Sequence, residues 1–151
     1  MFNAYMWLKF LHVTGVAIWF GGLTALITIN RRVSRSSETA IVAAVVHEAQ
    51  FVGTRVIAPA SGITLLAGVG MLLVSDGGFP LWVLWGVIVF FLFGLIGSTA
   101  IRATSADLQR LIASGNAQAG ELTPLLSRMA LLSTINLSLL ITAVWAMVFK
   151  P

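Results

Sequence analysis

Cysteine is absent from this 151-residue chain, which excludes disulfide bonds, thiolate metal sites, iron–sulfur clusters and covalently attached c-type haem. Charge is scarce as well, since Lys, Arg, Asp and Glu make up 9% of the residues, whereas a soluble domain carries roughly a quarter. Hydrophobic residues make up 58%, and the mean hydropathy is +0.98. The composition therefore predicts an integral membrane protein without a large soluble domain.

Several chemical motifs are missing too. No carboxylate lies deep in an apolar run, which disfavours a proton-relay pump of the usual acidic kind. No nucleophile elbow, phosphate-binding loop or His-Glu-x-x-His zinc motif occurs. The net charge of +4 does not indicate nucleic-acid binding, because the basic residues cluster beside apolar runs. We expect a lipid bilayer as the surroundings and no nucleic-acid partner, and enzyme activity stays open.

Four apolar runs predict an all-α, four-helix transmembrane bundle, a single domain over residues 1–151 with spans at about 4–29, 59–75, 81–101 and 129–149. The first run lacks the basic start of a signal peptide, so we expect it to remain as the first span. Residues 39–74 are typical of one helix of about 54 Å, which exceeds a bilayer. Its first half is therefore expected to extend on the cytoplasmic side, with a kink at Pro59.

The basic residues are distributed unevenly along these spans. Seven arginines are expected on one side: Arg31, Arg32, Arg35, Arg55, Arg102, Arg110 and Arg128. Lys9 and Lys150 fall near the other side, with Asp76. Because positive loops stay in the cytoplasm, the pattern predicts a multi-pass protein of the bacterial inner (plasma) membrane with both termini outside.

His12 is the one ionisable side chain well inside the first apolar run. A histidine at membrane depth normally faces the bundle interior and has a partner. The 3–4 spacing of one helix face joins it to Gly15, Trp19, Gly22 and Leu26. Glycines let helix backbones approach closely, so Gly22, and Gly68 in the second span, are predicted to lie at helix contacts.

The chain has only two histidines, His12 and His47, and one idea is that they hold a haem iron from opposite faces. At 1.5 Å per residue, His12 lies about 12 Å inside the outer end of its span, whereas His47 lies about 42 Å from that surface. The two are therefore expected near opposite membrane faces. His47 with Glu48, Gln50 and Arg55 could form a small polar site, but the pattern favours the solvated face of an amphipathic helix.

If His12 binds a haem iron, a second protein ligand to that iron has to lie at the same depth in the bilayer as His12. The other three spans reach that level near Leu66, Ile88 and Ile141. Met71 and Met147 are the weaker candidates nearby, and methionine is a known haem ligand. Spacing alone favours a different interpretation, in which His12 hydrogen-bonds a hydroxyl or a backbone carbonyl of a neighbouring helix.

Three stretches carry a family resemblance: residues 8–13 with 19–22, residues 55–59 leading to 68–73, and residues 128–151. Together they resemble an uncharacterised family of four-span bacterial integral membrane proteins, distantly similar to copper resistance protein D and HemJ-type protoporphyrinogen oxidase. In the HemJ-type enzymes the first-span histidine, matched here by His12, is associated with b-type haem. The third span lacks their lysine and histidine, and no glutamate accompanies Asn136, so the oxidase activity is not carried over.

The leading hypothesis is a haem b-binding, redox-associated membrane protein centred on His12. The alternatives are a small transporter or copper-handling membrane protein, and a non-catalytic membrane assembly subunit. Besides lipid, the expected partners are a second copy of the chain or a redox protein.

Overall fold

The computed structural model describes residues 3–35, 38–75, 78–115 and 119–150, and its secondary-structure elements are all helical. They are, in order, α1 (Ala4–Val33), α2 (Thr39–Val52), the π-helical turn η1 (Gly53–Ile57), α3 (Ala58–Leu73), α4 (Leu81–Ile96), the π-helical turn η2 (Gly97–Ile101), α5 (Arg102–Ala113) and α6 (Ala119–Phe149). Because α2 runs through η1 into α3, and α4 through η2 into α5, the described residues form four long helices. Each is long and apolar enough to cross a membrane, which confirms the predicted four-helix bundle. The limits of the spans within these helices remain predictions.

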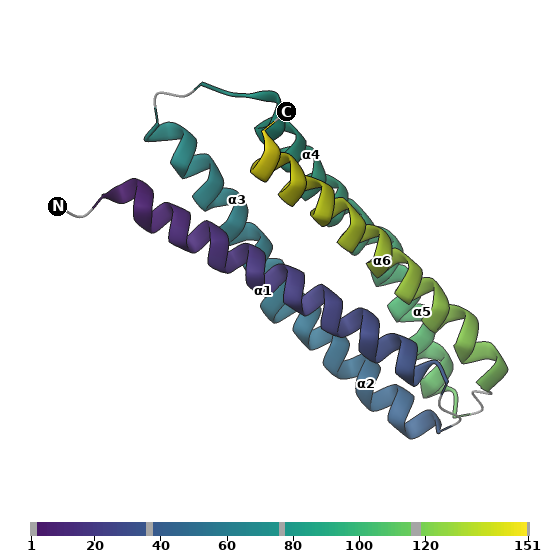
Figure 1. Cartoon of the computed structure of the whole chain (residues 1–151). Coiled ribbons are helices and arrows are strands. Elements are labelled where there is room, and N and C mark those ends of the chain that lie inside the picture. Colours follow the sequence, from purple (N-terminus) through teal and green to yellow (C-terminus); the bar gives the residue numbers. More distant parts are fainter. Residues whose placement is uncertain (1–2, 36–37, 76–77, 116–118, 151) are drawn as a thin grey trace.

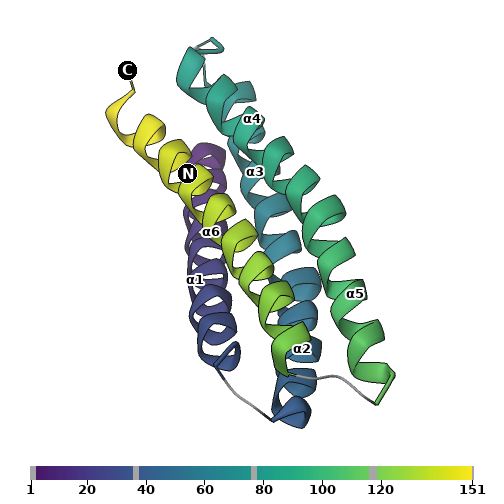
Figure 2. The ribbon, with the colours of Figure 1, turned by 90° about the vertical axis from the view of Figure 1, so that its right-hand side faces the viewer.

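The four long helices are arranged as two pairs (Figures 1 and 2). Helix α1 packs along α3 and also contacts α6, while α4 packs along α6 and touches α3 little. Both chain ends lie at one end of the bundle, here called the terminal end (Figure 1). The opposite end, which includes Arg31, Arg32 and Arg110 near the ends of α1 and α5, is called the arginine end. The α1–α3 pair and the α4–α6 pair diverge toward the terminal end (Figure 1).

The outer surface of the bundle is apolar. Leu66 and Leu73 on α3 are 72% and 82% exposed, and Phe91 and Leu95 on α4 are 65% and 58% exposed. A soluble protein rarely exposes so continuous an apolar surface, whereas lipid solvates it well. The packing therefore agrees with the composition in placing these faces against acyl chains.

Two apolar clusters form the core. The first lies toward the arginine end, where α1, α2, α5 and α6 meet, and consists of Val33, Val42, Val46, Leu108, Leu122, Leu126 and Met129. The second lies nearer the middle of the bundle and consists of Trp19, Leu23, Ile57, Ala60 and Leu140. These clusters hold the long helices together, and the cavities described below lie on either side of the second one.

The expected kink at Pro59 takes the form of a π-helical turn. Proline lacks an N–H, and its ring crowds the carbonyl four residues earlier. The backbone adapts just before it, where the Ala58 N–H donates to the Gly53 carbonyl five residues back and the helix widens. A second such turn, η2, begins at Gly97, and there the Arg102 N–H donates to the Gly97 carbonyl. This second turn was not predicted from the sequence.

Close glycine contacts join α1 to η1 and α3, as predicted. A Cβ on Gly22 would lie 2.8 Å from Cγ1 of Ile57 in η1, and one on Gly68 in α3 would lie 3.2 Å from the His12 ring. A Cβ on Gly15 would collide with the Thr64 hydroxyl and lie 3.0 Å from the Ala60 carbonyl oxygen. The helix contacts predicted at Gly22 and Gly68 are therefore confirmed.

The helix starts show two local details. Glu38 occupies the N-cap position of α2, but its side chain makes no cap hydrogen bond. Helix α6 begins at Ala119, and Pro124 lies inside its second turn. Asp76, on which the orientation prediction drew, lies outside the described residues.

Candidate functional site

Two cavities lie along the bundle, separated by aromatic side chains. The His12 cavity, nearer the terminal end, is lined by α1, α3, α4 and α6. The Asn136 cavity lies nearer the arginine end, and residues of both π-helical turns are part of its lining. Trp19 lies between them: it lines the first cavity and packs edge-on against Phe93 of the second, with ring centroids 4.7 Å apart.

His12 is held by the neighbouring helix. Its Nδ1 lies 2.8 Å from the backbone carbonyl oxygen of Thr64 on α3. A carbonyl only accepts hydrogen bonds, so Nδ1 is the donor, and in the neutral tautomer that fits this bond the lone pair is on Nε2. Gly68 makes room for the ring, because any side chain there would press against it. This is the hydrogen bond to a neighbouring carbonyl that spacing alone favoured.

Apolar side chains form most of the wall of the His12 cavity, which has a volume of about 60 Å³. Met147 on α6 also lines it, and its methyl group occupies the space beside Gly86 on α4. Met71 is not among the lining residues. The structure therefore brings Met147, but not Met71, to the same cavity as His12. Buried Trp19 adds an indole Nε1–H that has no hydrogen-bond partner in the described part of the chain.

The Asn136 cavity is larger, about 420 Å³, and more polar. Its polar lining comes from all four long helices: Asn30, Gln50, Thr54, Ser98, Arg102, Ser105, Ser133 and Asn136. Asn136 is 1% exposed, and neither its Oδ1 nor its Nδ2 has a partner among the described residues. This site was not predicted from the sequence. The signals that could have indicated it are Asn136 inside the last apolar run and the glycines Gly53 and Gly97 inside long helical segments.

Comparison with known protein families identifies the family of this chain. The model of a family described as predicted integral membrane protein (DUF2269) matches residues 6–151. The chain belongs to the DUF2269 family. No curated protein and no solved structure matches it significantly. Membership together with the four apolar helices makes this DUF2269 chain an integral membrane protein, with the lipid bilayer as its surroundings.

The second histidine of this DUF2269 protein lies far from the first. His47 is exposed on α2, and the Thr64 carbonyl that binds His12 is 17 residues further along the same long helix, or about 25 Å. The two histidines therefore do not face one common site, in agreement with the depth estimate.

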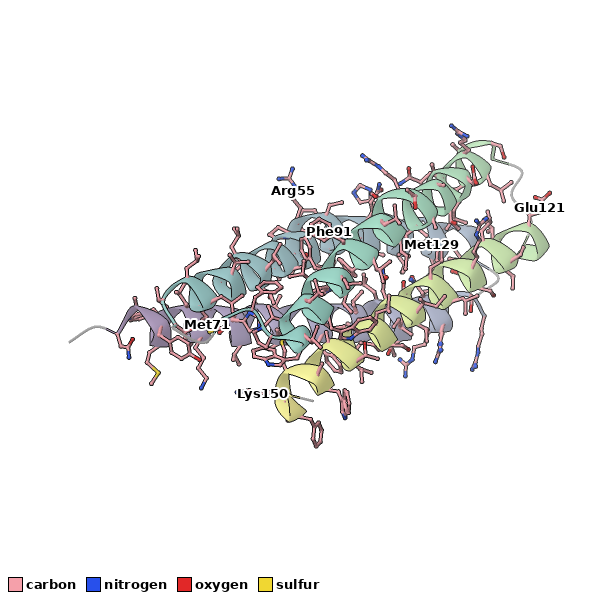
Figure 3. The ribbon with its side chains drawn as sticks, turned by 90° about the horizontal axis from the view of Figure 1, so that it is seen from above. Arg55, Met71, Phe91, Glu121, Met129 and Lys150 are labelled. Atoms are coloured by element: carbon pink, nitrogen blue, oxygen red, sulfur yellow. The ribbon has the colours of Figure 1, made fainter. Side chains whose placement is uncertain are left out.

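The polar residues around His47 do not assemble into a site. Figure 3 shows Arg55 projecting away from the bundle, and no ion pair joins it to Glu48 in the described part of the chain. Gln50 instead accepts a hydrogen bond from Gln109 on α5, with Nε2 and Oε1 2.6 Å apart. No group of three His, Asp or Glu side chains that could hold a metal ion occurs among the described residues. His47 thus belongs to a polar outer face.

Proposed function

We propose that this protein binds haem b through His12 and serves a redox function in the bacterial inner membrane. The observation that carries the proposal is the hydrogen bond from Nδ1 of His12 to the Thr64 carbonyl. Metal-binding histidines almost always donate their other ring N–H in this way, which fixes the tautomer and raises the basicity of the ligating nitrogen. The resemblance of the first span to HemJ-type proteins points to the same residue.

The residues around His12 are of the right chemical kind for haem. His12 would supply an axial nitrogen and Met147 a thioether, a pair that favours the reduced iron, and the remaining wall is apolar. Haem supplies one-electron transfer when bound, while the protein holds it and keeps water away. Thr64 is only 6% exposed, and this burial protects the hydrogen bond that orients the imidazole.

Haem binding requires more space than the His12 cavity has. A cavity of about 60 Å³ is smaller than the roughly 300–1,000 Å³ pockets that hold cofactor-sized ligands. Binding therefore requires Met147 to leave its place beside Gly86 and the two helix pairs to separate at the terminal end. Methionine is flexible, and α3 and α4 touch little, so the space would open between these two helices.

The test is a visible spectrum of the protein purified after expression with added haem precursor. We expect a Soret band and a b-type α-band on reduction in the wild type and in His47→Ala, and neither in His12→Ala. Met147→Leu should retain haem with a lowered potential. Equal retention in both alanine variants would leave His12 a packed polar residue. A colourless wild type would end the haem proposal.

Copper is the second candidate, since one observation favours it. His12 and Met147 line one cavity, and imidazole with thioether is a ligand pair that Cu(I) accepts. Titration of the purified protein with Cu(I) against a chelator competitor tests it. Binding lost in both His12→Ala and Met147→Leu, in a protein that takes up no haem, would favour copper handling. If neither cofactor binds, a non-catalytic assembly subunit becomes the better interpretation.

We also propose that the arginine end faces the cytoplasm, so that both termini lie outside. Three arginines, Arg31, Arg32 and Arg110, lie near helix ends there, and cytoplasmic loops carry such an excess. At the terminal end, Lys150 places its ammonium 5.7 Å from the Trp82 ring centre, as an interfacial lysine and tryptophan would.

A further inference from the structure

Burying the side-chain amide of Asn136 is energetically unfavourable unless another molecule forms hydrogen bonds with it. It lies about 12 Å along α6 from Arg128, within a run that is predicted to cross the membrane. Each buried polar group without a hydrogen-bond partner costs about 1–3 kcal/mol, and Asn136 has two. Such groups are rare in folded proteins unless water or a ligand completes them.

We propose that the Asn136 cavity binds a small amphipathic molecule whose polar end is a carboxamide-type group. Nδ2 of Asn136 can only donate and Oδ1 can only accept. A partner that satisfies both needs a donor and an acceptor side by side, as an amide has. Protonated amines only donate, ethers only accept, and quaternary ammonium groups do neither.

The walls of the cavity define the rest of the ligand. Leu23, Ile57 and Phe93 give it an apolar side, which suits a hydrocarbon or aromatic body. A volume of about 420 Å³ falls within the roughly 300–1,000 Å³ of small-molecule pockets and exceeds what a few waters need. The ligand is therefore more than a bound water.

Charge further narrows the ligand class. Arg102 is the one ionisable side chain among the described residues that line the cavity, and no carboxylate lines it. A cation would meet a like charge and no counter-ion in surroundings of low dielectric constant. Cations are therefore disfavoured, which separates this site from the cation-binding pockets of many membrane proteins.

The π-helical turns supply open space for the ligand. Gly53 and Gly97 begin η1 and η2, both line the cavity, and a Cβ on either would meet nothing within 4 Å. Few contacts join η1 and α3 to α4 and η2. A lipid-soluble molecule can therefore approach from the bilayer between the two turns. Widened turns of this kind occur often at functional sites.

The experiment compares octanamide with octyltrimethylammonium, two probes that share a chain length and differ in the head group. Thermal unfolding of the full-length protein in nanodiscs is followed by intrinsic fluorescence at rising probe concentration. We expect octanamide, but not the ammonium probe, to raise the Tm of the wild type. Asn136→Leu should weaken octanamide binding about tenfold or more, since a hydrogen-bonded group is lost.

Ser138→Leu is the matched control, because it places the same side chain on an exposed face of the same helix. It should respond to octanamide like the wild type, and so should His12→Ala, whose cavity is a different one. Equal Tm shifts in Asn136→Leu and Ser138→Leu would overturn the proposal. No octanamide response in the wild type would overturn it too and leave a cavity that holds only water or lipid.

A photolabel keeps the test decisive if Asn136→Leu fails to fold. A diazirine-bearing octanamide is activated on the wild-type protein, and the labelled peptides are mapped by mass spectrometry. Adducts on residues 93–102 and 129–136 that unlabelled octanamide competes away would support the site. Adducts confined to lipid-facing residues such as Leu66 and Leu73 would refute it.

Discussion

Replacing Gly15 with alanine tests the closest contact in the bundle, that between α1 and α3. The added methyl group would lie 3.0 Å from the Ala60 carbonyl oxygen and would collide with the Thr64 hydroxyl. The backbone oxygen cannot turn away, so α1 and α3 have to move apart. Gly21 offers a matched control on the same helix, because a Cβ there would meet nothing within 4 Å.

The expected magnitude follows from two opposing effects. Each Gly→Ala change gains up to about 1 kcal/mol of helix propensity. Gly15→Ala also overpacks a tight contact, which costs typically about 1–3 kcal/mol. The free energy of unfolding should therefore differ between the two variants by about 1–3 kcal/mol, with Gly21→Ala the more stable. At roughly 2–4 °C per kcal/mol for a chain of this size, the Tm values differ by about 2–12 °C.

The assay is thermal unfolding in one detergent, followed by the helical circular dichroism signal for wild type, Gly15→Ala and Gly21→Ala in parallel. A Tm for Gly15→Ala equal to or above that of Gly21→Ala would show that the helices are not in close contact at this position, and the reasoning from Cβ distances would be wrong.

Three further predictions concern orientation, a hydrogen bond and a second glycine. Single cysteines at Asp76 and Ser114 should differ in labelling of intact cells by an impermeant reagent, with only the first accessible, and the reverse pattern would invert the topology. Thr142→Val removes the hydroxyl that accepts from Trp85 Nε1 at 3.1 Å, and should lower unfolding free energy in detergent by about 0.6 kcal/mol; no change would mean that lipid or water replaces the bond. Gly22→Leu should lower the Tm by several degrees, at roughly 2–4 °C per kcal/mol of overpacking, and an unchanged melting curve would contradict the contact with Ile57 of η1.

The sequence predicted the features that depend on one helix alone. Long apolar runs had to become helices, because a bilayer offers no water to satisfy free backbone groups. The 3–4 spacing from His12 through Trp19 predicted which face of α1 meets protein, and Trp19 is indeed 3% exposed. The rise per residue separated His12 from His47, and the long second helix keeps them apart. Helical geometry is local, so these inferences needed no partner.

Tertiary packing decided how the helices face one another. Leu66, Ile88 and Ile141 were predicted to lie at the same level of the bundle as His12, and residues next to them in the chain do line the His12 cavity. These three side chains themselves point outward, since they are 72%, 39% and 49% exposed. Uniformly apolar helices carry almost no signal of which side faces protein, because lipid and protein interior are equally apolar. Met147 rather than Met71 reached the His12 cavity for the same reason.

The Asn136 cavity depended still more on the tertiary structure. Its polar side chains come from segments that are far apart in the sequence, and each one alone is compatible with an ordinary hydrogen bond within its helix. Only the fold shows that Asn136 has no such bond. The fold alone also brings the glycines of the two π-helical turns to the same cavity. A sequence determines which groups a helix carries, while the rotation of each helix against its neighbours determines which of these groups meet.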